Sequence, residues 1–186
     1  EAENKYCGGT AVAEQVKPLL PASGIMVVDL GCGTGIASIP FRSIAAQLIG
    51  VDVTASMVAQ AQKEMLGGKP LFDRVVEADI NVAGEVVTSA SADLVLLVNA
   101  VQFVGALQGV LHGAARLLKT RGFLAITVEP YKGGEGFGIV PGAGRFGHQP
   151  AYVRQVAEPL GLTQVKEIKL ALYPGTDATL LIFQKG

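Results

Sequence analysis

Apolar runs of strand length alternate along the chain with segments whose apolar residues recur at helical spacing. The helical segments lie at 10–20, about 35–48, 54–65, about 105–119 and about 150–160. The strand-like runs lie at 25–30, 47–52, 74–79, 93–98, 123–129, 165–173 and 178–185. Most of these runs are continuously apolar rather than alternating, which is typical of parallel strands that are covered on both faces.

The order of these elements predicts an α/β fold. Strand–helix alternation favours a seven-stranded, mostly parallel sheet with helices on both faces. The last two runs are joined by PGTD, residues 174–177, a turn signal that predicts an antiparallel last strand. We find no internal repeat and no linker, so we expect residues 1–186 to form a single domain.

Composition narrows the class of protein. With 49% apolar residues and a net charge of −1, the chain is globular and lacks the basic stripe of a nucleic-acid binder. The run 94–115 carries no formal charge, but polar residues interrupt it, so we predict no membrane span. The N-terminal EAENKYCGG lacks the apolar part of a secretory signal. Two cysteines, Cys7 and Cys32, make neither a disulfide framework nor a metal site, so we expect a cytoplasmic protein without a metal. The oligomeric state is left open, a homo-oligomer included.

The stretch VVDLGCGTG, residues 27–35, joins the first predicted strand to the next predicted helix. Its glycines at 31, 33 and 35 allow positive φ and a close approach of the backbone to a ligand. Ligands of such sheets bind beyond the carboxyl ends of the strands, and the N–H groups of a following helix point to the same place. We therefore expect a flat, polar ligand to lie against this turn.

The spacing of the glycines argues against a dinucleotide. The dinucleotide fingerprint would place its third glycine at position 36, which is Ile36. Asp29, inside the first strand, would repel a pyrophosphate but suits a ligand that carries a cation. S-adenosylmethionine is such a ligand, because it has an ammonium and a sulfonium group.

With these features, VVDLGCGTG resembles the first motif of class I S-adenosylmethionine-dependent methyltransferases. Two further acids stand in the family's order: Asp52 ends the second predicted strand and Asp79 ends the third. A carboxylate at position 52 can accept hydrogen bonds from both ribose hydroxyls. The resemblance covers residues 25–129 and implies a Rossmann-like fold, with S-adenosylhomocysteine as the product.

The same resemblance implies a set of cofactor-binding residues. Asp79 would accept from the adenine amino group, with Ile80 and Met57 packing on the ring. Asn99 follows the fourth predicted strand, where it either touches a ligand or forms a turn. The full set is Asp29, Gly31, Cys32, Gly33, Gly35, Asp52, Val53, Met57, Asp79, Ile80 and Asn99.

The acceptor side is predicted in and beyond the glycine-rich loop 129–150. The segment from Arg145 through His148 to Tyr152 resembles part of the methyltransferase domains that often follow tetratricopeptide repeats. We predict His148 as a base or substrate contact, and Arg145 and Tyr152 as residues that orient the substrate. The alternative for His148 is a histidine bonded to backbone at a helix start. Glu129 either shapes the pocket or pairs with Arg145, and the loop is either a mobile lid or a rigid series of turns.

The expected reaction is methyl transfer to a small-molecule acceptor. The segment NAVQF, residues 99–103, stands where nucleic-acid amino-methylating enzymes of this fold carry an Asn-Pro-Pro-aromatic motif. We therefore expect a small, fairly apolar metabolite that is methylated on oxygen, with nitrogen and carbon as the alternatives. Three alternatives stay open: a non-methylating member of the fold that uses the bound cofactor for cyclisation or elimination, a cofactor-binding subunit without catalysis, and a nicotinamide-dependent reductase, which Ile36 disfavours.

Overall fold

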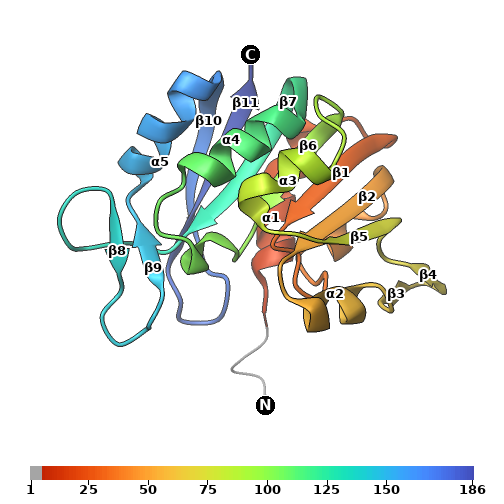
Figure 1. Ribbon diagram of the computed structural model, residues 1–186, viewed down its shortest axis with the longest axis horizontal. Helices are drawn as coiled ribbons and strands as arrows, with labels where there is room; N and C mark the ends of the chain where they lie inside the picture. The colour runs from red at the N-terminus through yellow and green to blue at the C-terminus, as the bar shows by residue number, and fades with distance from the viewer. Residues whose placement is uncertain (1–5) are drawn as a thin grey trace.

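A seven-stranded sheet forms the centre of the molecule. The computed structural model describes residues 6–186, and the strand order is β10-β11-β7-β6-β1-β2-β5 (Figure 1). β11 runs antiparallel to both of its neighbours, and the other neighbouring pairs are parallel. The predicted sheet, with its antiparallel last strand, is therefore confirmed. The strands are β1 Ile25–Leu30, β2 Ala45–Asp52, β5 Arg74–Glu77, β6 Ala92–Leu97, β7 Leu118–Val128, β10 Leu162–Leu170 and β11 Ala178–Lys185.

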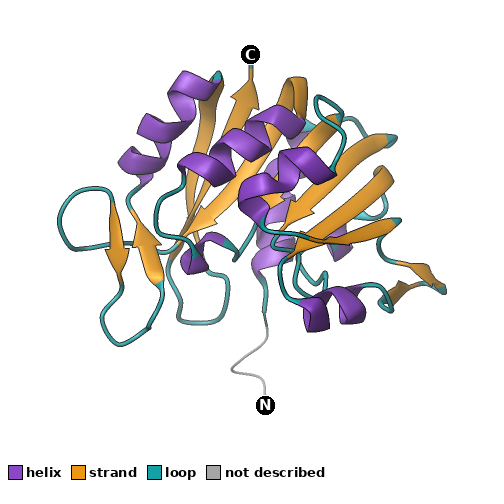
Figure 2. Ribbon diagram, viewed as in Figure 1, coloured by secondary structure: helices purple, strands orange, loops and turns teal. Residues whose placement is uncertain are grey.

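Helices pack on both faces of this sheet (Figures 1 and 2). The α-helices are α1 Gly8–Val16, α2 Ala55–Ala61, α3 Ala83–Val86, α4 Gln108–Leu117 and α5 Pro150–Ala157. Short 3-10 helices are η1 Lys17–Leu19, η2 Ile39–Phe41, η3 Ile80–Val82, η4 Val101–Phe103 and η5 Glu158–Leu160. In the described part of the chain, no helix has the length and apolarity that crossing a membrane requires.

The two faces of the sheet bury two separate apolar clusters. Val28 and Leu97 belong to the cluster that α3, α4 and α5 cover, whereas Val27 and Leu96 belong to the cluster that α1 covers. Successive residues of a strand point to opposite faces, so both sets must be apolar when both faces are covered. This is why the central strands show no polar alternation in the sequence.

The helix predicted over about 35–48 is wrong. The described chain forms turns there, in which N–H groups reach carbonyls three residues back, as from Ser38 N to Gly35 O and from Phe41 N to Ser38 O, both at 2.9 Å. Pro40 has no N–H to donate to a fourth-residue carbonyl, and Gly35 has a left-handed φ of 95°. β2 therefore begins at Ala45, and no α-helix directs its N–H groups at the glycine turn.

Two hairpins stand in segments predicted as helix or loop. α2 ends at Ala61 rather than near residue 65, and β3 Met65–Leu66 then pairs with β4 Lys69–Pro70. Within the loop 129–150, β8 Phe137–Ile139 pairs antiparallel with β9 Phe146–His148. The second hairpin gives the acceptor side of the molecule an ordered framework. That this loop acts as a mobile lid stays a prediction.

Truncation of the central strand tests how the core is built. Leu96→Ala and Leu97→Ala each remove a fully buried side chain, one on each face of β6. We expect each variant to lower the free energy of unfolding by about 2–5 kcal/mol in urea titrations. Leu66→Ala is the matched control, since Leu66 is 41% exposed on β3, and we expect a change below about 0.5 kcal/mol. Equal losses for all three would contradict this description of the core.

Candidate functional site

The loop after β1 is clamped to the end of the neighbouring strand β2. Gly31 N and Cys32 N both donate to Val51 O, at 2.8 and 3.1 Å, and Gly33 N donates to Asp52 Oδ2 at 2.9 Å. The three glycines of the loop have φ values of 75°, 52° and 95°, all in the left-handed region. The loop is thus held by backbone hydrogen bonds that require glycine conformations.

Packing closes two of the three glycine positions and leaves the third open. A Cβ at Gly31 would lie 2.6 Å from Ala100 Cβ, and one at Gly35 would lie 2.5 Å from Phe72 Cε2. A Cβ at Gly33 would meet no described atom within 4 Å. A ligand can therefore lie against the backbone at Gly33, beside the Asp52 carboxylate.

Asp29 is fully buried in β1, beneath this loop. Its Oδ2 accepts a hydrogen bond from Ser38 Oγ at 2.7 Å, and its Oδ1 has no partner among the described residues. Burial raises the pKa of Asp29 to about 7; Ser38 lowers it and the charge of Asp52 raises it further. The hydroxyl of Tyr6 is also buried without a described partner, and burial, followed by the charge of Asp29, raises the pKa of Tyr6. A cationic ligand group would compensate both features.

Asp52 combines a structural contact with remaining acceptor capacity. Besides the bond from Gly33, its Oδ1 accepts from Thr54 N at 2.9 Å, and the side chain is 9% exposed. An ionised carboxylate offers about four lone-pair sites. Two of these stay available, which suits a ligand that presents two hydroxyl groups.

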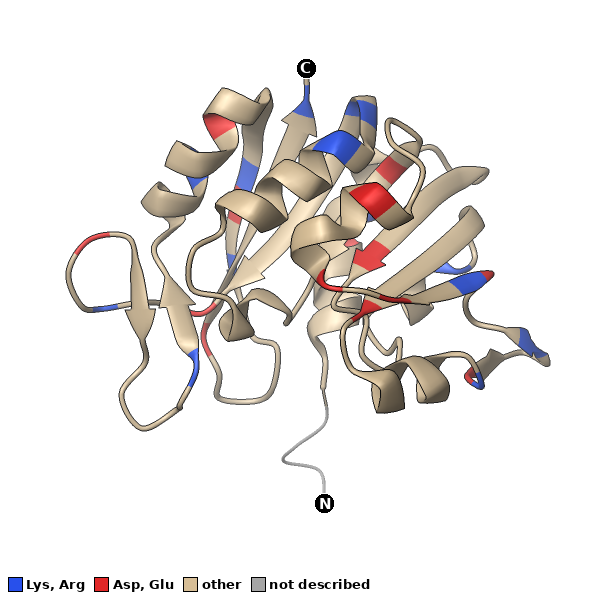
Figure 3. Cartoon of the chain, in the orientation of Figure 1, with Lys and Arg blue, Asp and Glu red and all other residues tan. Residues whose placement is uncertain are grey.

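The third predicted acid lies in a more open setting. Asp79 is exposed, and its Oδ1 accepts from Asn81 N and Nδ2, both at 2.8 Å, so its Oδ2 is available. Ile80 is buried, whereas Met57 and Val53 are 38% and 65% exposed. The exposed side chains of Met57 and Val53 are available to pack on a flat ring. In Figure 3, acidic positions lie at this edge of the sheet, and both acidic and basic positions lie toward the opposite edge.

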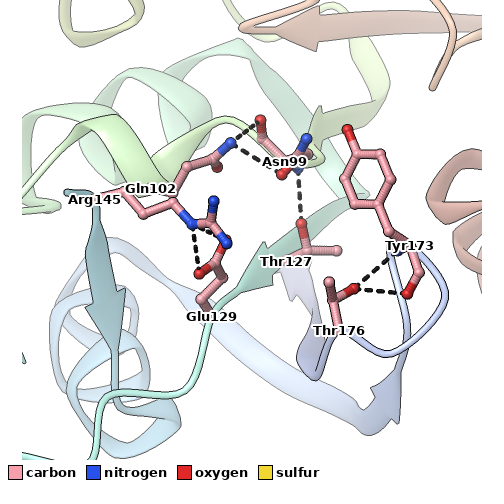
Figure 4. A network of polar contacts seen from close by, with 7 residues as sticks. All are labelled: Asn99, Gln102, Thr127, Glu129, Arg145, Tyr173 and Thr176. Atoms are coloured by element: carbon pink, nitrogen blue, oxygen red, sulfur yellow. Dashed lines mark hydrogen bonds and ion pairs between the residues drawn. The ribbon is translucent and has the colours of Figure 1, made fainter. Parts of the chain in front are cut away.

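Asn99 forms a turn and also lines a cleft. It has a left-handed φ of 55°, and its N–H donates to Thr127 Oγ1 at 2.8 Å. Gln102 donates from Nε2 to the backbone oxygen and to Oδ1 of Asn99, at 2.8 and 2.9 Å (Figure 4). Both interpretations of Asn99 from the sequence thus find support in its position.

A cleft of two adjoining lobes lies beyond the carboxyl ends of β6, β7 and β10. The lobes have volumes of about 580 and 460 Å³, and the residues that line both are Glu129, Arg145, Thr176 and Asp177. Arg145 Nε donates to Glu129 Oε2 at 2.8 Å and lies 2.7 Å from Oε1. The predicted pairing of Glu129 with Arg145 is present, and Arg145 faces the cleft as an acceptor contact would.

His148 and Tyr152 do not line either lobe. His148 is fully buried, with Nε2 2.9 Å from Gly105 O and Nδ1 unpartnered among the described residues. Burial lowers the pKa of His148, and hydrogen bonds to the backbone of Gly105 and Val104 act in the opposite direction. The hydroxyl of Tyr152 accepts from Leu107 N at 2.9 Å. Both polar groups therefore bind backbone before helix α4, which agrees with the alternative stated for His148, and their roles as acceptor contacts stay predictions.

Sequence reasoning missed Gln102, Tyr173, Thr176 and Asp177 as cleft residues. The last three lie in the connection from β10 to β11, where the sequence predicted a strand up to Tyr173 and only a turn at residues 174–177. β10 pairs antiparallel with β11, and β11 pairs antiparallel with β7, so β10 runs in the direction of β7. The residues after β10 therefore reach the same carboxyl edge as those after β7, and the strand-end rule could have identified them.

Residues 28–126 match the family described as a methyltransferase domain. The chain is 30% identical over 111 residues to the ubiquinone biosynthesis O-methyltransferase of Bradyrhizobium sp. (strain ORS 278), covering 60% of this chain and 42% of that protein. It is 33% identical over 116 residues to the malonyl-[acyl-carrier protein] O-methyltransferase of Enterobacter lignolyticus (strain SCF1), covering 62% of this chain and 43% of that protein. The matched part thus spans less than half the length of these relatives.

A solved structure shares the fold over nearly the whole chain. It is the magnesium protoporphyrin IX methyltransferase of Synechocystis PCC 6803 with bound S-adenosylhomocysteine, with a TM-score of 0.75 and 19% identity. The superposition covers 96% of this chain and 83% of that chain. At this level of identity the similarity concerns the fold, so the assignment of individual site residues rests on the geometry above.

The buried carboxyl of Asp29 predicts a pH-dependent stability. Its pKa of about 7 in the folded state lies above the ordinary value of 3.8, so its stabilising effect is complete below the ordinary value and is lost as the pH rises through about 7. The unmodified chain should lose stability over this range, whereas Asp29→Asn should not. We therefore expect the free energy of unfolding of Asp29→Asn, relative to that of the unmodified chain, to rise by on the order of 2 kcal/mol between about pH 5 and about pH 8. Urea unfolding at each pH measures this.

Ser38 supplies the internal control for this titration. Its hydroxyl lowers the pKa of Asp29, so Ser38→Ala should move the same loss of stability to higher pH, and Asp29→Asn should abolish the effect of Ser38→Ala on the profile. Parallel profiles for Asp29→Asn and the unmodified chain would show that this carboxyl does not titrate in the stated range.

Proposed function

The chain belongs to the methyltransferase-domain family, and on that premise we propose that it transfers the methyl group of S-adenosylmethionine to an oxygen atom of a small, largely apolar acceptor. The observation that carries the proposal is Asp29, a fully buried carboxyl with an unpartnered oxygen beneath the glycine loop. A buried carboxylate without a cation is costly. A ligand that brings positive charge to this place offsets that cost, whereas a pyrophosphate would increase it.

The described residues fit this cofactor. Asp29 and the hydroxyl of Tyr6 offer unpartnered buried atoms for its charged end, and the backbone at Gly33 is open. Asp52 has acceptor capacity for the ribose hydroxyls, and Asp79 has a free oxygen for the adenine amino group. The other residues that we assign to this site are Gly31, Cys32, Gly35, Val53, Met57, Ile80 and Asn99.

When bound, the cofactor supplies a methyl carbon activated by a positively charged sulfur. The chain itself must align the acceptor and exclude water. Asn99 lies at the end of β6 and lines the smaller lobe of the cleft, so it connects the cofactor side to the acceptor side. Lobes of about 580 and 460 Å³ suit a small molecule.

The proton of a hydroxyl acceptor needs a base in the cleft. His148 is buried outside the lining of both lobes, so we assign it to the positioning of β9. The carboxylates of Glu129 and Asp177 line both lobes. Glu129 is held by Arg145, whereas Asp177 forms no ion pair with a described residue. We therefore assign Asp177 as the base that accepts the proton of the acceptor.

Removal of the Asp52 carboxylate tests the cofactor assignment. Each hydrogen bond to a charged acceptor contributes about 1.5–3 kcal/mol, so we expect Asp52→Ala to weaken S-adenosylmethionine binding by about 10-fold or more in calorimetry. Asp52→Asn keeps one carbonyl oxygen and should lose less. The matched control is Glu77→Ala, an exposed acid in register with Asp52 on β5, which should bind as the unmodified chain does. Unchanged affinity in Asp52→Ala, with the fold retained, would remove Asp52 from the site.

The reaction itself is tested with a labelled methyl donor. The chain is incubated with isotopically labelled S-adenosylmethionine and pools of small metabolites, and products are read by mass spectrometry. We expect a labelled product with equimolar release of S-adenosylhomocysteine. Conversion of a metabolite without that release would contradict methyl transfer and indicate cyclisation or elimination instead.

A further inference from the structure

Resting on the proposed function, which places the acceptor in the two-lobed cleft, we propose that this acceptor carries a carboxylate group that Arg145 binds. The proposal concerns the class of substrate: an apolar molecule with one planar anionic group. It follows from how Arg145 is held, from what lines each lobe, and from the nitrogen atoms that the Arg145–Glu129 pair leaves unused.

Arg145 is held at one end and free at the other. Only Nε of its guanidinium group contacts Glu129, at 2.7 and 2.8 Å from the two carboxylate oxygens. No described residue accepts a hydrogen bond from its two terminal nitrogens, and its side chain is 42% exposed. In Figure 4 the guanidinium group of Arg145 lies between the side chains of Gln102 and Glu129. Two parallel N–H donors are therefore presented to the cleft.

Main-chain hydrogen bonds hold the backbone segments that carry Arg145 and Glu129. Arg145 O accepts from Val140 N at 2.8 Å across the turn between β8 and β9. Glu129 O accepts from His148 N at 2.9 Å, which ties the end of β7 to β9. Both members of the pair are thus anchored through their own main chain. A planar guanidinium that Glu129 holds at Nε is suited to bidentate binding of a carboxylate through its terminal nitrogens.

The two lobes differ in chemistry on either side of Arg145. The larger lobe presents Pro130, Tyr131, Ile139, Val140 and Pro141, and Ile139 is 54% exposed. The smaller lobe adds the amides of Asn99 and Gln102 to an apolar lining of Phe103, Leu172, Tyr173 and Pro174. Arg145 lines both lobes, so an acceptor with its apolar body in the larger lobe places a carboxylate at the boundary, within reach of the free donors.

The charges nearby favour a single anionic group. Glu129 and Asp177 line both lobes and would repel a highly charged ligand, whereas Lys132 lines the larger lobe only. Glu129 neutralises part of the Arg145 charge but occupies only its Nε. One carboxylate can therefore pair with the terminal nitrogens, and a ligand with several phosphates would meet two acids.

A pair of isosteric probes tests the proposal without knowledge of the natural acceptor. The chain is saturated with S-adenosylhomocysteine and titrated with 2-naphthoate and with 2-naphthamide, which differ in charge and not in shape. We expect 2-naphthoate to bind the unmodified chain more tightly. In Arg145→Gln its dissociation constant should rise by about 10-fold or more, while that of 2-naphthamide stays unchanged.

Three further variants sharpen the result. Arg145→Lys keeps the charge but lacks the planar fork, so most of the preference for 2-naphthoate should be lost. Glu129→Gln removes a competing carboxylate, so 2-naphthoate should bind more tightly. The matched control is Arg154→Gln, because Arg154 is also 42% exposed and also pairs with a glutamate, Glu167, but lies on α5 outside both lobes. It should change neither probe.

Equal affinities of the two probes for the unmodified chain, or an unchanged preference in Arg145→Gln, would overturn the proposal. The proposed function is tested separately, because it fails if the chain does not bind S-adenosylhomocysteine. In that case the effect of Arg145→Gln on 2-naphthoate is still measured on the chain alone, and loss of the preference for 2-naphthoate supports the carboxylate site while its absence refutes it.

Discussion

The candidate site depends on the hydrogen bonds that attach the loop after β1 to the end of β2. Gly31, Cys32 and Gly33 donate to Val51 O and to the Asp52 carboxylate. These bonds hold three consecutive peptide groups against the neighbouring strand, and the left-handed glycines make that path available. Asp52 thereby serves the loop and the proposed ribose contact with one carboxylate. The sheet places both strand ends at one edge, so the site is a consequence of parallel pairing.

The loop in turn buries Asp29, and this burial connects stability to function. A carboxyl group with one unpartnered oxygen in the core raises the free energy of the folded chain at neutral pH. In the proposed function, a cationic ligand restores the interaction that the unpartnered oxygen of Asp29 lacks. A site of this kind is expected to be weakest when empty and to gain stability on binding.

Much of this arrangement could be predicted from the sequence. The apolar runs located the sheet strands, and the glycine spacing with three acids at successive strand ends predicted where the cofactor binds. The apolar spacing after the glycines is compatible with a helix and also with turns around Pro40 and Phe41, so periodicity alone could not decide between the two. The sequence left two roles open for His148, because its neighbours in sequence do not reveal that its Nε2 lies 2.9 Å from Gly105 O, far along the chain. The cleft residues after β10 could be identified only when the direction of β10 relative to β7 was known.

The central claim is that glycine backbone ringed by carboxylates selects a cationic adenosyl ligand over a pyrophosphate nucleotide. Parallel calorimetric titrations of the chain with S-adenosylmethionine and with NAD test it most directly, at a pH where Asp29 is ionised. We expect saturable binding of S-adenosylmethionine and no heat of binding for NAD. Saturable binding of NAD that S-adenosylmethionine does not displace would contradict it.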